Sequence, residues 1–132
     1  MKRELKRKFD RLGIAVVYLF GSKATGRESR LSDIDIGVVL QKASPGDDTR
    51  DLYHHLYELF SEVYPASRLG VVFLQEAPLS LQYSAVREGK ILFETDPKFT
   101  VDYENIEMNQ YLDFRFVLDY FDKVTMERYA KA

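Results

Sequence analysis

Residues 19–36 read LFGSKATGRESRLSDIDI: an apolar run ends in Gly-Ser, ten residues follow, and Asp-x-Asp opens a second apolar run. Side chains two apart on a strand point to one face, which places the Cα atoms of Asp33 and Asp35 roughly 6 to 7 Å apart. Two carboxylates so close repel each other unless a cation lies between them. Carboxylate oxygens suit Mg²⁺, which takes one or two of them and fills its other positions with water and substrate phosphates. The pattern therefore predicts Asp33 and Asp35 as metal ligands for a phosphate compound.

The residues around the aspartates extend this predicted site. Gly21 lets the backbone approach a ligand, Ser22 adds a hydroxyl, and N–H groups at a following helix start favour anions. Gly37 continues the face of the aspartates with no side chain, which predicts room for a nucleotide. Three basic residues of the connection are expected to offset phosphate charge: Lys23, Arg27 and Arg30.

The composition predicts one soluble globular domain over residues 1–132, with 45% hydrophobic and 30% charged residues. A net charge of -2 gives no field that would attract nucleic acid strongly. The absence of cysteine excludes disulfides, thiolate catalysis and cysteine-ligated metals. No apolar run approaches the ~20 residues needed to span a bilayer, so no membrane contact and a cytoplasmic location are expected.

Apolar periodicity predicts strands that interleave with helices along the chain. The expected strands are residues 14–20, 34–38, 69–74 and 91–93. The expected helices are residues 2–12, 52–63, 78–88 and a long one from about 101 to the end, with a short helical turn and loop over 22–32. This order indicates an α/β or α+β fold in two layers.

The segment GSKATGRESRLSDIDIGVV, residues 21–39, resembles the nucleotidyltransferase superfamily of DNA polymerase β, whose signature is Gly-Ser, a variable loop and Asp-x-Asp. More narrowly, it is similar to the minimal nucleotidyltransferases, small prokaryotic proteins often encoded beside a HEPN-domain partner. The resemblance continues more loosely through residues 74–94 and the aromatic-rich C-terminal helix. It implies a mixed central sheet flanked by helices, Mg²⁺, and transfer of a nucleoside monophosphate to a hydroxyl, with ATP as the substrate.

The resemblance also implies a partner. In similar toxin-antitoxin pairs the minimal transferase is the antitoxin and adenylylates a tyrosine of the HEPN ribonuclease. The chain holds little beyond a catalytic domain, which favours an acceptor that brings its own binding surface, namely a protein. A third, less favoured interpretation is a small-molecule adenylyltransferase of the aminoglycoside-modifying type.

The sequence departs from the family pattern at Gly70. Such transferases carry a third carboxylate on the next central strand, where it helps to hold the metal that activates the attacking hydroxyl. Its loss predicts that nucleotide binding survives and that catalysis is slow, needs high metal, or borrows a carboxylate from Glu76 or from the partner. The alternative is an inactive nucleotide-binding antitoxin that neutralises its partner by occupying it.

Two other groups of residues are expected to play no part in the chemistry. His54 and His55 are adjacent, so on a helix they point about 100° apart and are expected to be surface residues. Four tyrosines near the C-terminus are candidates for a partner surface: Tyr103, Tyr111, Tyr120 and Tyr129.

Overall fold

The computed structural model describes residues 3–21, 34–43 and 46–130. Its helices are α1 (Arg3–Arg11), α3 (Arg50–Ser61), α4 (Leu79–Glu88) and α5 (Pro97–Ala130), with short 3₁₀ turns η1 (Ala66–Arg68) and η2 (Leu74–Glu76). Its strands are β1 (Ile14–Phe20), β2 (Ile34–Leu40), β3 (Leu69–Phe73) and β4 (Lys90–Glu94). The predicted alternation is confirmed, although β2 runs two residues further than expected and α5 begins about four residues earlier. The helical turn expected within 22–32 lies outside the described residues.

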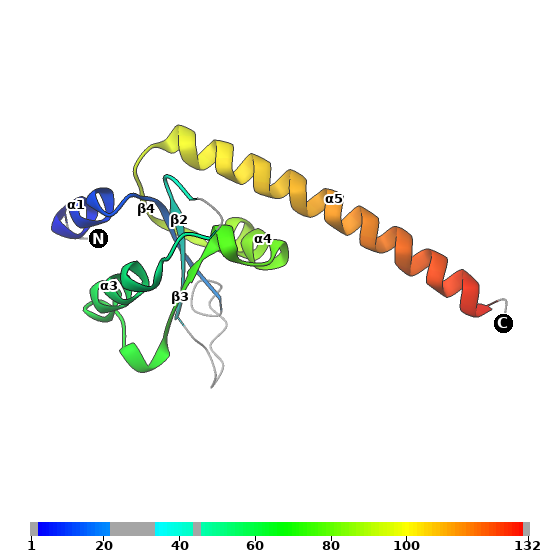
Figure 1. Ribbon diagram of the computed structural model, residues 1–132, viewed down its shortest axis with the longest axis horizontal. Coiled ribbons are helices and arrows are strands. Elements are labelled where there is room, and N and C mark those ends of the chain that lie inside the picture. The colour runs from blue at the N-terminus through cyan, green and yellow to red at the C-terminus, as the bar shows by residue number, and fades with distance from the viewer. Residues whose placement is uncertain (1–2, 22–33, 44–45, 131–132) are drawn as a thin grey trace.

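The four strands form one mixed sheet in the order β3-β2-β1-β4 (Figure 1). β1 runs antiparallel to β2 and to β4, whereas β2 and β3 are parallel. The sequence of β1, IAVVYLF, is apolar at every position but one, and all of its residues except Leu19 are buried. This confirms the prediction of a central strand covered on both faces.

Helices cover both faces of the sheet, so the expectation of two layers is wrong. On one face α1 and α3 pack with the strands, and the Phe9 ring lies 5.2 Å from the Phe60 ring and 5.4 Å from the Phe93 ring. On the other face Leu74 and Ala85 form a second apolar cluster with α4 and the start of α5. The physical reason is that β1 and β2 carry apolar side chains on both sides, and each side must be buried. None of the described helices combines the length and apolar character needed to cross a membrane.

A side-chain amide fixes the pairing of β2 with β3. The backbone N–H of Leu40 donates to Oε1 of Gln75 at 2.8 Å, and Nε2 of Gln75 donates to the Leu40 carbonyl at 3.0 Å. Gln75 therefore continues the hydrogen-bond ladder after β3 has turned into η2. This contact holds the register of the two strands at the end opposite to the start of β2.

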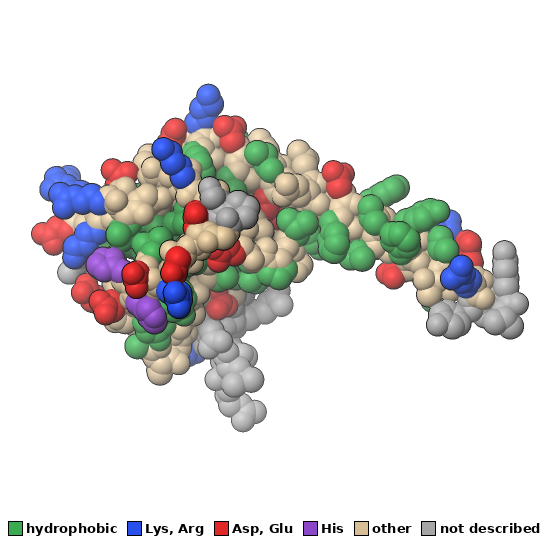
Figure 2. All heavy atoms as spheres, viewed as in Figure 1, with side chains coloured by type: hydrophobic (Ala, Val, Ile, Leu, Met, Phe, Trp, Pro, Cys, Tyr) green, Lys and Arg blue, Asp and Glu red, His purple; other side chains and the backbone are tan. Residues whose placement is uncertain are grey.

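The first half of α5 is joined to the body by polar contacts. The Tyr18 hydroxyl on β1 donates to Oε1 of Glu104 at 2.7 Å, and the Tyr103 hydroxyl donates to Oε1 of Gln82 on α4 at 2.9 Å. Burial, followed by nearby carboxylates, raises the pKa of both tyrosines, so both stay protonated. The second half of α5 extends beyond the body, with apolar side chains exposed along it (Figures 1 and 2).

Glu107 is a buried acidic residue on the side of α5 that faces the body. Its side chain is 1% exposed, and neither carboxylate oxygen has a hydrogen-bond partner among the described residues. Burial and, to a smaller extent, the charge of Glu104 raise the pKa of Glu107 from 4.5 to about 7. An ionised carboxylate without a partner is costly to bury, so this position weakens the docking of α5 once Glu107 loses its proton.

Replacing Glu107 tests this cost. Because the folded-state pKa is raised, the folded protein binds the proton more tightly than the unfolded chain, and the free energy of unfolding falls as pH rises from about 4.5 to about 7. Glu107→Gln removes the ionisable group, and near pH 8 it should raise the free energy of unfolding by at most about 3 kcal/mol. Urea titrations at several pH values measure the effect, with Glu127→Gln on the exposed half of α5 as control. An unchanged pH dependence in Glu107→Gln would contradict this account.

Candidate functional site

The candidate site lies where β1 ends and β2 and β3 begin. The antiparallel register pairs Phe20 with Asp35, and the parallel register pairs Asp35 with Gly70. Asp35 is therefore the middle residue of a row across three strands. Its side chain is half-buried, on the face of the sheet that α4 covers further along.

Two glycines border the Asp35 carboxylate. Gly21 has φ +84°, and a Cβ there would overlap Oδ2 of Asp35. A Cβ at Gly70 would lie 3.3 Å from Oδ1 of the same carboxylate. The carboxylate thus fills space that side chains would take at either position, with backbone close on both sides. This arrangement holds the carboxylate oxygens at the strand ends. A ligand bound to these oxygens would lie near the backbone of the two glycines.

The Asp35 carboxylate oxygens are ligands of the kind that a hard divalent cation such as Mg²⁺ prefers. Asp35 supplies one carboxylate, and its expected companion Asp33 lies outside the described residues. Among the residues that the structure describes, no group of three or more His, Asp or Glu side chains is arranged to hold a metal ion.

The structure places only part of the predicted site. Gly21 and Asp35 lie together at the strand ends, as described above. The other predicted residues of the connection lie outside the described residues: Ser22, Lys23, Arg27, Arg30 and Asp33.

The room expected beside Gly37 is filled. Gly37 is buried, and a Cβ there would lie 2.9 Å from Cδ1 of Leu74, whose own side chain is fully buried. Gly37 lacks a side chain so that η2 can pack against β2. The expectation of open space for a nucleotide at this position is wrong for that reason.

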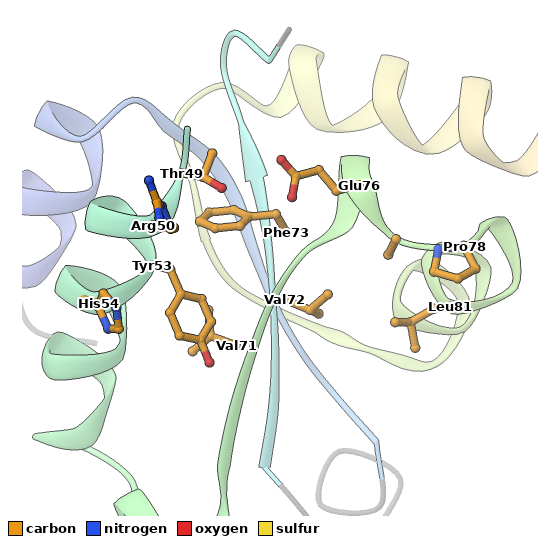
Figure 3. A pocket seen from close by; sticks show the side chains of 11 residues that line it. Thr49, Arg50, Tyr53, His54, Val71, Val72, Phe73, Glu76, Pro78 and Leu81 are labelled. Carbon is orange, nitrogen blue, oxygen red and sulfur yellow. The ribbon is translucent and has the colours of Figure 1, made fainter. Parts of the chain in front are cut away.

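Glu76 does not stand near the position of the missing carboxylate. It lies in η2, past the end of β3 that is opposite to Gly70, and Figure 3 shows it beyond Phe73. Because a strand rises ~3.3 Å per residue, Gly70 and Phe73 alone are roughly 10 Å apart. The structure therefore gives no support to Glu76 as a substitute ligand.

An apolar pocket of about 520 Å³ lies along β3, an edge strand of the sheet (Figure 3). Tyr53 and Phe73 line it on the α3 side, and Leu81 lines it on the α4 side. His54 stands at its rim, and both His54 and His55 are exposed, as expected. No sequence pattern predicts this pocket, because its lining comes from four separate elements: α3, β3, η2 and α4. Its apolar lining suits an aliphatic or aromatic group rather than a phosphate.

Gly21→Ala tests the contact with Asp35. A residue with a Cβ at φ above zero costs about 1–2 kcal/mol in the free energy of unfolding. Overlap with the Asp35 carboxylate should add on the order of 1–3 kcal/mol. Gly46→Ala is the matched control, because Gly46 has φ +86° and nothing within 4 Å of a built Cβ. Equal losses in the two variants, measured by chemical denaturation, would show that Gly21 does not constrain Asp35.

Comparison with known protein families gives one match. The sequence profile of the family "Polymerase beta, Nucleotidyltransferase" matches residues 3–98, which include β1, β2 and Asp35. No curated protein sequence matches the chain at a significant level.

Solved structures share the fold. A chain of a toxin-antitoxin crystal structure with AMP-PNP is 23% identical with a TM-score of 0.69, covering 96% of this chain and 99% of that chain. A chain of the MntA-HepT toxin-antitoxin structure is 21% identical with a TM-score of 0.63, covering 95% and 99%. A third comes from the tri-AMPylated Shewanella oneidensis HEPN toxin in complex with the MNT antitoxin, with 23% identity, a TM-score of 0.52 and coverage of 90% and 97%. At these identities the similarity establishes the fold alone.

Proposed function

The chain belongs to the polymerase β family of nucleotidyltransferases, and from this premise we propose that it transfers AMP from ATP to a tyrosine hydroxyl of a HEPN-domain toxin, as the antitoxin of the pair. The observation that carries the proposal is the Asp35 carboxylate, held at the strand ends between Gly21 and Gly70. That place lies inside the segment matched by the family profile.

Two of the similar structures support the choice of nucleotide and acceptor. One is a toxin-antitoxin structure with AMP-PNP, and another holds an AMPylated HEPN toxin with its MNT antitoxin. Both structures are only 23% identical to this chain, so the same chemistry is proposed for it rather than established by the similarity.

The proposed reaction is a single displacement at phosphorus. The tyrosine oxygen forms a bond to the α-phosphorus of ATP and loses its proton to water, while the bond from that phosphorus to the bridging oxygen breaks and pyrophosphate leaves. Asp33 and Asp35 would hold Mg²⁺, which would neutralise charge on the phosphates and favour ionisation of the attacking hydroxyl.

The chain's other residues at this edge would position the triphosphate. Gly21 would admit backbone close to the phosphates, and Ser22 would offer its hydroxyl and N–H. Lys23, Arg27 and Arg30 would balance the remaining negative charge.

Mass spectrometry of the acceptor tests the proposal. The purified chain is mixed with ATP, Mg²⁺ and a HEPN-domain protein from the same genome, taken first from the adjacent gene. Tyrosine-linked AMP should appear on the HEPN protein, and Asp35→Asn should abolish it, because a neutral amide no longer balances the cation and its phosphates. Glu76→Gln is the control and should retain the modification, since Glu76 lies at the far end of β3. AMP transfer that persists in Asp35→Asn would show that the site is wrongly assigned.

A second candidate function is supported by Gly70. Gly70 on β3 is paired with Asp35 on β2. Because it is glycine, it offers no carboxylate at this position. In this case the chain would bind nucleotide without catalysing transfer, and it would neutralise the toxin by binding to it. An unmodified toxin that is nevertheless silenced by the chain supports this candidate over the first.

Gly70→Asp separates a slow enzyme from an inactive one. A Cβ at Gly70 would lie 3.3 Å from Oδ1 of Asp35, so the Asp35 carboxylate must shift by a few tenths of an ångström to admit a side chain there. If the missing ligand limits the rate, Gly70→Asp should transfer AMP about tenfold faster or more, which corresponds to lowering the activation free energy by about 1.4 kcal/mol or more. Gly70→Asn, equal in size and neutral, should give no gain. A rate that is unchanged or lower in Gly70→Asp, in single-turnover assays, would reject the missing ligand as the limitation.

A further inference from the structure

The second half of α5 is exposed. Tyr111 is the last residue packed on the body, with its ring stacked 4.1 Å from that of Tyr83 on α4. Every residue from Leu112 to Arg128 is exposed. Figure 1 shows this half of the helix extending past the sheet and its flanking helices.

Nine large apolar residues are exposed on this segment, and five of them form a stripe on one side. They are Phe114, Val117, Leu118, Phe121 and Val124, with exposed fractions of 46%, 47%, 45%, 59% and 37%. Their spacing of three and four residues places them on one helix face. We call this set the distal stripe, and Figure 2 shows apolar side chains gathered along this half of α5.

The distal stripe continues the side of α5 that faces the body. Tyr111 contacts α4, and Phe114 and Leu118 follow it at helical spacing of three and seven residues. An uncovered helix of this length is marginal in water, because most helical stability in proteins comes from burying an apolar face. Something must therefore cover the stripe for the helix to be stable.

We propose that the distal stripe pairs with the same stripe of a second copy of this chain, antiparallel, as a short two-helix coiled coil. In this pairing Leu118 of one copy packs against Phe121 of the other, and Phe114 packs against Thr125. Val117 and Val124 then meet along one flank. This inference does not rest on the proposed transfer reaction.

Charge complementarity favours a second copy in this orientation. Arg115 and Asp122 flank the stripe on the same side, and antiparallel pairing places each beside the other residue of the second copy. The twofold axis produces this ion pair twice. A parallel pair would instead place Arg128 against Arg128 near the seam and would leave Arg115 without an acidic neighbour across the interface.

Sedimentation velocity of the purified full-length chain tests the proposal. We expect a reversible monomer–dimer equilibrium in the micromolar range. Leu118→Glu should make the chain monomeric throughout, and because glutamate is a good helix former at this exposed position, the domain should still fold. Phe116→Glu is the matched control: Phe116 is 75% exposed on the opposite side of α5, so this variant should still dimerise.

Charge reversal tests the orientation. Arg115→Asp and Asp122→Arg should each weaken dimerisation about tenfold or more, since each creates two repulsive contacts. The double variant should restore the native dissociation constant within about threefold, because the pair is re-formed with its charges exchanged.

Three results would overturn the proposal. The first is a native chain that stays monomeric at every concentration, with the stripe covered only in complex with a different protein. The second is a dimer that survives Leu118→Glu or is lost in Phe116→Glu. The third is a double charge variant that dimerises no better than the single ones, which would reject the antiparallel arrangement.

Discussion

The candidate site depends on one steric constraint, the confinement of the Asp35 carboxylate between two glycines. Gly21 turns the chain out of β1 with a positive φ and admits Oδ2, while Gly70 admits Oδ1 from the neighbouring strand. The contact with Gly21 requires the β1–β2 register that pairs Phe20 with Asp35. The contact with Gly70 requires the β2–β3 register that pairs Asp35 with Gly70, which Gln75 helps to hold at the other end of these two strands. The backbone of the two glycines therefore lies close to the carboxylate on both sides. Gly70 makes room for the Asp35 carboxylate, but because it is glycine it places no second carboxylate beside Asp35.

Helices packed on both faces of the sheet hold the strands that carry Asp35 and the two glycines. The two halves of α5 differ in their contacts with this body. The aromatic cluster around Phe9 covers one face, and α4 with the start of α5 covers the other. The first half of α5 is attached through Tyr18 and Glu104, but the buried Glu107 opposes this attachment when it is ionised. The second half contributes nothing to the described core. A chain that keeps so much apolar surface on a helix outside its core uses that surface for association.

Much of the fold could be predicted because its strands are short apolar runs bounded by glycine or polar residues. The start of α5 was predicted too late, although Asp96-Pro97 is a helix-start signal: Asp96 accepts a hydrogen bond from a backbone N–H of the first turn at 3.0 Å. Periodicity placed Gly37 on the face of Asp35 correctly, but it cannot show that Leu74, far along the chain, covers that glycine. Sequence distance also made Glu76 look close to the site, whereas the turn after β3 carries it to the opposite end. The position of Asp35 was predictable because its spacing from Gly-Ser is local, and the residues of the connection remain predictions.

The central claim is that Asp35 holds a divalent ion at the strand ends beside Gly21 and Gly70. A crystal structure of the chain with Mn²⁺ and a non-hydrolysable ATP analogue, with anomalous diffraction recorded for manganese, tests it most directly. The account predicts an anomalous peak at coordination distance from an Asp35 oxygen, bridging it to the phosphates at the end of β1. A peak elsewhere, or an Asp35 side chain turned away from the bound triphosphate, would contradict it.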